Sequence, residues 1–195
     1  MNYLAHAFLS FNNPQILVGN MVADFVKGAK KFNYPLQVQH GMQLHRAIDA
    51  FTDAHTITKQ IKQVFVPTYR LYAGAFLDIC YDHFLATHFN NYSNMPLLKF
   101  TENTYQILNN NAKNLPLLFS KILPYMQSQN WLYNYKYKWG IQKSFEGLKH
   151  RAKYITETVT AYQLFTVHYN LLQTGFVAFF DDLYKFTEQE YLKIS

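Results

Sequence analysis

The chain has 195 residues, of which 49% are hydrophobic and 15% are charged, and its formal net charge is +6. This length fits one domain over residues 1–195, while the 17 Phe and 16 Tyr exclude disorder and the lone Cys80 excludes a disulfide framework. No apolar run approaches the ~20 residues that cross a bilayer, and the start lacks the basic region of a signal peptide, so we expect a cytoplasmic protein with no membrane contact.

Helical periodicity runs along nearly the whole sequence. Asn13 and Pro14 predict the N-terminus of a helix, and Gly28 predicts its end after Val26 and Lys27. Further helices are expected over residues 38–52 and 68–89, followed by several that are separated by Pro96, Pro116 and Pro124. Alternating β-branched runs with Asn-Gly or Asp-Gly turns are absent from the sequence. We therefore predict an all-α fold, a single-domain helical bundle.

Aspartate and histidine are concentrated in the first half of the chain. Residues 1–98 contain five Asp and no Glu, whereas residues 99–195 contain five Glu among seven acids. Six of the eight histidines also lie in residues 1–98. Glu is the better helix former, so solubility does not explain a half that uses only Asp. Short carboxylates and imidazoles are ligands that helices offer to a metal, and this pattern favours a metal centre.

The segment GMQLHRAIDAFTDAH, residues 41–55, carries the clearest pattern. On a helix His45, Asp49 and Asp53 are four residues apart and share one face, with Arg46 at its edge. The alternative is a solvated face with ordinary charges, which does not require His or short carboxylates. We interpret this face as part of a metal site.

The segment LYAGAFLDICYDHFLATHF, residues 71–89, is apolar nearly all round and is expected to be a buried central helix. Asp78 and Asp82 share one face of it, and an unpaired buried carboxylate costs several kcal/mol or gives up its charge. Each therefore needs a metal, an arginine or a set of hydrogen-bond donors. His83 points about 100° away from Asp82, so both can serve one centre only if neighbouring helices converge.

Three further residues are weaker candidates. Asp24 is a carboxylate within the apolar stretch GNMVADFVKG, and Lys27 follows it where a helix end alone would favour a cation. Within the same stretch Gly19 is costly in a helix, which indicates close packing or close approach of a ligand. His6 stands in NYLAHAF, where a single histidine is more often a hydrogen-bonded core residue than a ligand.

The pattern favours phosphoester hydrolysis over other chemistries. The sequence has no GxGxxG, GxxxxGK[ST], GxSxG or HExxH motif, and Cys80 lies in the apolar segment rather than in an electropositive loop. Aspartates and histidines on helices, with Arg46 and Lys27 nearby, suit a metal-activated water that attacks a phosphoester.

The chain resembles the acyl carrier protein phosphodiesterase family in four ordered motifs: MNYLAHAFLS, GNMVADFVKG, GMQLHRAIDAFTDAH and YRLYAGAFLDICYDHF. The likeness runs from Met1 to about Phe89 and is weaker at WLYNY. It implies a divergent, all-helical relative of the HD-domain metal-dependent phosphohydrolases that prefers Mn²⁺. The implied reaction removes 4′-phosphopantetheine from the serine of holo-acyl carrier protein. The sequence departs from the family pattern at Ala47 and Thr56, and the order Asp82-His83 reverses that of the HD superfamily.

The pattern and the resemblance together give the expected site. The expected metal ligands, for Mn²⁺ or another divalent ion, are His6, Asp24, His45, Asp49, Asp78, Asp82 and His83. The residues expected to act in catalysis are Lys27, Arg46, Asp53 and His55. Two alternatives stay open: the same chemistry on a nucleotide or other small phosphodiester, and a non-catalytic basic helical module that binds an acidic partner. No nucleic-acid-binding motif accompanies the charge, so we expect no nucleic acid.

The partner is expected to dock on residues 136–153, KYKWGIQKSFEGLKHRAK. This stretch holds six Lys and Arg against the single acid Glu146, with Trp139 and Phe145 interleaved. Acyl carrier proteins are small and acidic, so a basic patch would steer and orient one. The alternative is an ordinary solvated basic helix.

Overall fold

The computed structural model describes residues 1–194, with the backbone alone at Arg151, and it confirms the all-α class: these residues form no strand. The α-helices are α1 (Tyr3–Phe8), α2 (Pro14–Val22), α3 (Leu36–Ala54), α4 (Thr56–Ile61), α5 (Val66–Tyr69), α6 (Ala73–Thr87), α7 (Leu97–Asn110), α8 (Leu117–Ser128), α9 (Trp131–Asn134), α10 (Lys138–Arg151), α11 (Val159–Val167) and α12 (Tyr169–Leu192). Short 3₁₀ turns are η1 (Ala23–Phe25), η2 (Gly28–Asn33), η3 (Lys62–Val64), η4 (Arg70–Tyr72), η5 (Phe89–Asn91) and η6 (Ala112–Asn114).

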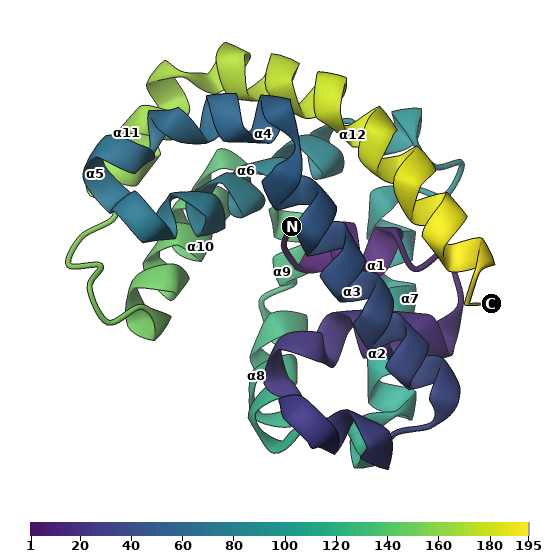
Figure 1. The fold of residues 1–195 in the computed structure, drawn as a ribbon. Helices are drawn as coiled ribbons and strands as arrows, with labels where there is room; N and C mark the ends of the chain where they lie inside the picture. Colours follow the sequence, from purple (N-terminus) through teal and green to yellow (C-terminus); the bar gives the residue numbers. More distant parts are fainter. Residues whose placement is uncertain (195) are drawn as a thin grey trace.

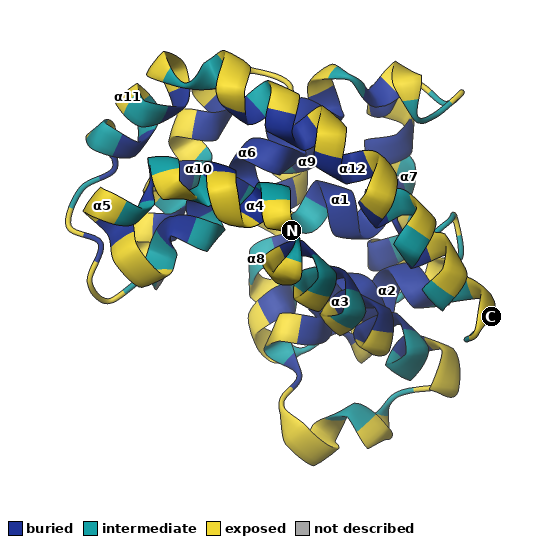
Figure 2. Cartoon of the chain, turned by 45° about the horizontal axis from the view of Figure 1, so that its top comes forward, coloured by how far each residue is buried: buried dark blue, intermediate teal, exposed yellow. Residues whose placement is uncertain are grey.

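Helix α6 is the centre of the fold, as its apolar sequence predicts. Eleven of its 15 residues are buried, and Figure 2 shows it as a dark blue helix behind the surface helices. Helices α1, α10 and α12 pack on it, and α12 continues over α3 and α4 (Figure 1). The N-terminus lies near the middle of the molecule, beside α3, in both views. The first residues of the chain therefore belong to the interior.

Helices α2 and α3 cross in backbone contact at two glycines. A Cβ atom added to Gly19 would lie 2.0 Å from the Val38 carbonyl oxygen, and one added to Gly41 would lie 2.3 Å from the Ile16 carbonyl oxygen. Neither position has room for a side chain, so the close packing expected at Gly19 is present. This crossing brings the end of α2 against the middle of α3.

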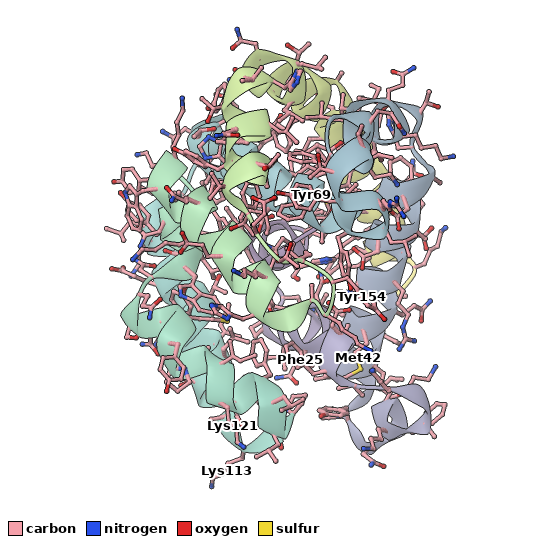
Figure 3. All side chains as sticks on the ribbon, turned by 90° about the vertical axis from the view of Figure 1, so that its left-hand side faces the viewer. Phe25, Met42, Tyr69, Lys113, Lys121 and Tyr154 are labelled. Carbon is pink, nitrogen blue, oxygen red and sulfur yellow. The ribbon has the colours of Figure 1, made fainter. Side chains whose placement is uncertain are left out.

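Helix α10 is held on the core by aromatic side chains. Phe145 is fully buried and its ring packs edge-on against that of Phe76 at 5.1 Å between centroids. Beyond α10, the Tyr69 hydroxyl donates to Glu157 (2.9 Å) and accepts from the Ala161 amide (2.8 Å), which ties the following segment to α5. Figure 3 views this side of the molecule and labels Tyr69. These contacts fix the position of α10, and with it the position of its solvent-facing side.

Most of the expected helix boundaries are present. The Asn13 carboxamide oxygen accepts from the amides of Gln15 (3.1 Å) and Ile16 (3.2 Å), which confirms the predicted start of α2. Pro96 and Pro116 directly precede α7 and α8 as predicted. Pro124 was expected to separate helices, but it lies inside α8.

Two other boundaries were wrong. Helix α2 ends at Val22 rather than at Gly28, because the chain tightens into η1 and then becomes extended at Val26; Gly28, with φ of +60°, opens η2 instead. The expected helix over 68–89 is interrupted by Arg70, whose φ of +47° places it outside the helical region. Among residues 1–194, no helix has the length and apolar character needed to cross a membrane.

We predict that Gly41→Ala lowers the free energy of unfolding by about 2–4 kcal/mol, because the new methyl group forces the backbones of α2 and α3 apart. Gly147→Ala is the matched control: a Cβ there meets no atom within 4 Å, so the gain in helix propensity should raise stability by about 0.5–1 kcal/mol. Urea unfolding followed by circular dichroism measures both. Equal effects of the two substitutions would contradict the steric account of the crossing.

Candidate functional site

Three side chains from two helices converge beside the N-terminus. His6 comes from α1, and His45 and Asp49 come from α3, one helical turn apart. Asp49 Oδ1 lies 3.2 Å from His6 Nε2, and Asp49 Oδ2 lies 3.2 Å from His45 Nε2. Potential ligand atoms of all three lie within 4.8 Å of one another. We call His6, His45 and Asp49 the His–Asp cluster.

Asn20, at the end of α2, orients both histidines of the cluster. Its side-chain oxygen accepts from His6 Nδ1 (2.8 Å), and its main-chain oxygen accepts from His45 Nδ1 (2.8 Å). Both partners are oxygen acceptors, so each Nδ1 carries the proton and each Nε2 is directed to the cluster. The Asn20 amide nitrogen donates in turn to the His6 carbonyl (2.8 Å) and to Ser10 Oγ (3.1 Å). The two imidazoles stack with centroids 3.9 Å apart.

His6 Nε2 shows that the cluster fits a cation. It is buried and has no hydrogen-bond partner among the described residues. Since burial and the neighbouring His45 lower the pKa of His6 to about 4, this nitrogen presents a lone pair to the Asp49 carboxylate. Two acceptor atoms that face each other need a positive charge between them. Two imidazole nitrogens and a carboxylate also form a donor set that suits Mn²⁺, Fe²⁺ or Zn²⁺.

Two more carboxylates flank the cluster. Asp24 Oδ1 lies 3.3 Å from His45 Nε2, and its side chain is 79% exposed, so it marks the solvent side. The Met1 ammonium lies 3.1 Å from Asp49 and 3.2 Å from Asp78. The structure therefore brings together five of the seven expected metal ligands: His6, Asp24, His45, Asp49 and Asp78.

The charges of the site are strongly coupled. Burial opposes the charge of His45, but hydrogen bonds to Asp24 and Asp49 outweigh it and raise the His45 pKa to about 9. Burial likewise opposes the charge of Met1, yet Asp78 and Asp49 raise the pKa of its amine to about 11. Burial would raise the pKa of Asp49, but the hydrogen bond from His45, the adjacent His6 ring and the Met1 ammonium together lower it far below its usual value. Asp49 is thus an anion held between His45 and the Met1 ammonium, and it faces the His6 Nε2 lone pair.

Asp82 was expected to be a metal ligand, but the structure gives it another task. It is fully buried, and its two carboxylate oxygens accept from the amides of Leu4 (2.7 Å) and Ala5 (3.0 Å). Burial raises the Asp82 pKa to about 7, while these two amides oppose the shift. Asp82 satisfies the first turn of α1 and so positions His6. Of the three partners that the sequence allowed for Asp82, namely a metal, an arginine or a set of hydrogen-bond donors, the structure shows the donors.

His83 was also expected at the metal, and it too is engaged elsewhere. Its Nδ1 donates to the Tyr135 carbonyl (2.7 Å), and its Nε2 accepts from the Tyr169 hydroxyl (2.9 Å). Burial lowers the His83 pKa to about 4, so it stays neutral between these partners. The neighbouring helices do not converge to bring both Asp82 and His83 to one centre.

The four residues expected to act in catalysis do not lie together. Arg46 and Asp53 are exposed on α3, and Lys27 is exposed in the extended segment before η2 rather than at a helix end. His55 lies apart from the cluster: its Nε2 is 3.4 Å from Asp182 on α12, and its ring packs against Phe179. The structure thus places Arg46 next to the cluster residue His45 and places His55 in a contact between α3 and α12.

Sequence reasoning missed Asn20 and Met1. Asn20 had a usable signal, because it is a polar residue inside the apolar stretch ILVGNMV and a buried amide requires partners. Met1 had none, since its contribution comes from the main-chain amine and depends on where α1 is anchored.

The geometry defines a class: an all-helical protein in which two buried histidines and an aspartate form a cluster with the donor set of a cation site. The model of the family described as acyl carrier protein phosphodiesterase matches residues 1–183. An acyl carrier protein phosphodiesterase of Klebsiella pneumoniae subsp. pneumoniae is 31% identical over 98% of this chain and 100% of its own length. Proteins of the same name are 33% identical in an Enterobacter species and 29% identical in Yersinia pestis, each over 92% of this chain and 94% of its own length. The chain belongs to the acyl carrier protein phosphodiesterase family. No solved structure matches it.

We predict that His45 makes the stability of the metal-free protein fall as pH rises. Its folded pKa of about 9 exceeds the ordinary 6.5, so its contribution is fully present below pH 6.5 and is lost as pH rises through 9. The loss should reach about 3 kcal/mol between these values and should vanish in His45→Gln. Guanidinium unfolding of both proteins from pH 6 to 9.5 measures it, with the exposed His150→Gln as the control that keeps the slope. Parallel profiles for wild type and His45→Gln would contradict a charged His45.

Proposed function

We propose that this protein hydrolyses the phosphodiester that links 4′-phosphopantetheine to the serine of holo-acyl carrier protein, giving apo-acyl carrier protein, with Mn²⁺ or another divalent metal ion. Membership of the family supports the substrate. The observation that carries the metal-dependent chemistry is the His6 Nε2 lone pair opposite Asp49, in a cluster whose histidines are held in the ligand tautomer by Asn20.

The ion would be held by His6, His45 and Asp49, with Asp24 and Asp78 as the flanking carboxylates. When bound, such an ion polarises phosphoryl oxygens and lowers the pKa of a water molecule. Two histidines and aspartates on a helical frame are the elements of an HD-type phosphohydrolase, and we propose that this is a divergent one. Asn20 and Asp82 serve as positioning residues, since the first aligns both imidazoles and the second fixes the start of α1.

The substrate is expected to approach from the solvent side of the cluster, where Asp24 is exposed. Arg46 follows His45 directly and is exposed, and its guanidinium fork matches two phosphoryl oxygens. Lys27 lies three residues after Asp24 and is exposed as a second cation. These residues bind and orient the phosphate without holding the metal.

The carrier is proposed to dock on the basic face of α10 and its flanks. Lys149 and Lys153 are exposed there, and Trp139 is 48% exposed with the Lys143 ammonium 5.6 Å from its ring centroid. Phe145 was expected to belong to this surface, but it is fully buried in the core and anchors the helix instead. An acidic carrier would be attracted to the remaining positive charge.

Asp49→Asn is predicted to lower turnover of holo-acyl carrier protein by at least about 100-fold, more than the loss typical of an outer-shell change, because the shared anion of both histidines is removed. Mass spectrometry of the carrier, incubated with enzyme and Mn²⁺, measures the loss of the prosthetic group. Asp181→Asn, an exposed aspartate on α12, is the matched control and should turn over normally.

Full turnover by Asp49→Asn, or by wild type after exhaustive chelation, would contradict the metal-dependent mechanism. Absence of turnover by wild type with Mn²⁺ and intact holo-carrier would contradict the proposed substrate.

The docking face is tested by reversing charge at Lys149 and Lys153 together. The double change to Glu should raise KM for holo-carrier about 10-fold and leave kcat at saturating carrier unchanged, because only the encounter is weakened. The wild-type KM should rise with salt as the attraction is screened. The same reversal at the exposed Lys59 and Lys185, on α4 and α12, should have little effect. Equal changes in KM for the two pairs would place the docking site elsewhere.

A further inference from the structure

A groove of about 810 Å³ opens beside the first residues of the chain. Its walls come from α8, α9 and α10 and from the first residues of the chain. Among its lining residues are Asn2, Trp131, Asn134, Trp139, Ser144 and Gly147. The two indole rings supply apolar surface, while the side-chain amides and the hydroxyl supply donors and acceptors.

The groove adjoins the cluster through consecutive residues. Asn2 lines the groove, and the preceding Met1 places its amine 3.1 Å from Asp49. The Asn2 amide donates to the Tyr135 hydroxyl (2.8 Å), and the Tyr135 carbonyl accepts from His83. The wall near the cluster is therefore held by hydrogen bonds to α6. In Figure 1, α9 lies directly beside the N-terminus, in agreement with these contacts.

One face of α10 forms the long wall of the groove. Trp139, Lys143, Gly147 and His150 recur at three- to four-residue spacing, so they follow one side of the helix. From Trp139 to His150 this face extends about 16 Å at the helical rise of 1.5 Å per residue. This wall is therefore long enough for an extended chain to lie along it.

Gly147 keeps this wall open. A Cβ atom added there meets no atom within 4 Å, whereas one added to Gly140 on the same helix would lie 2.0 Å from the Asn134 carbonyl oxygen. Close packing therefore requires Gly140 but does not require Gly147. A glycine within a helix costs about 0.5–1 kcal/mol relative to alanine. A glycine at position 147 is explained if the space beside it is used by a ligand.

We propose that the groove binds the pantetheine arm of the carrier's prosthetic group, an inference that rests on the proposed function. The arm has two amides separated by short methylene segments, and its extended length equals about four residues of chain, roughly 14 Å. Its methylenes would pack on Trp131 and Trp139, and its amides would pair with side chains such as Asn2 and Asn134. The phosphate end would face the cluster beyond Asn2, and the thiol end would lie toward His150.

The test uses the protein's own fluorescence. The chain has two tryptophans, Trp131 and Trp139, and both line the groove, so indole emission reports on its occupancy. Pantetheine added to the metal-free protein should change this emission in a saturable way. Gly147→Leu should weaken that binding at least 10-fold by filling the groove. Gly74→Leu is the matched control, a helical glycine outside the groove whose added Cβ finds its nearest contact, a Lys62 side-chain carbon, at 3.9 Å.

Turnover separates this inference from the proposed function. Gly147→Leu should lower kcat/KM for holo-carrier at least 10-fold, with Mn²⁺ binding and unfolding temperature preserved. If holo-carrier is hydrolysed but pantetheine leaves the emission unchanged and Gly147→Leu acts normally, the groove assignment is overturned and the function stands. If pantetheine binds and Gly147→Leu abolishes binding while no variant hydrolyses holo-carrier, the groove stands and the proposed function fails.

Discussion

The site depends on one asparagine that holds two imidazoles from different helices. Asn20 accepts from His6 through its side chain and from His45 through its main chain, both at 2.8 Å. This is possible because Gly19 and Gly41 let α2 and α3 touch backbone to backbone. A side chain at either glycine would separate the helices and move the Asn20 carbonyl away from His45. The close packing of α2 on α3 therefore determines where the Nε2 atoms of His6 and His45 point.

The second constraint is the anchoring of the chain's first turn on α6. Asp82 accepts from the amides of Leu4 and Ala5, which fixes α1 and with it His6. The same anchoring buries the Met1 amine between Asp49 and Asp78, so positive charge already balances the inner carboxylates. One aspartate of the central helix, Asp82, thus organises the site without touching the Nε2 atoms of His6 and His45, whereas Asp78 of the same helix faces the site itself.

The sequence predicted much of this arrangement because its signals were local. Four-residue spacing put His45 and Asp49 on one face, and the apolar run of α6 predicted a central helix with buried carboxylates in need of partners. The sequence did not distinguish Asp82 from the expected metal ligands, because a buried carboxylate can be satisfied either by the amides of a helix N-terminus or by a metal ion. The sequence also placed His83 at the metal. Its actual partners, the Tyr135 carbonyl and the Tyr169 hydroxyl, are brought to it only by the tertiary fold, so nothing in the sequence indicates them. The positive φ of Arg70, which divides the expected helix over 68–89, has no signal in residue type.

The most direct test of the central claim is Mn²⁺ binding to the metal-free protein, followed by electron paramagnetic resonance, in wild type and in Asn20→Ala. The account predicts binding by wild type and a 10–100-fold weaker affinity in the variant, because His6 loses the partner that fixes its tautomer. Ser10→Ala removes an acceptor of the Asn20 side-chain amide and a donor to the His6 carbonyl but leaves both imidazole contacts of Asn20 in place, so it should bind Mn²⁺ almost as wild type does. Circular dichroism confirms that the variants are folded. Wild-type affinity in folded Asn20→Ala would contradict the claim that Asn20 prepares the cluster for its metal.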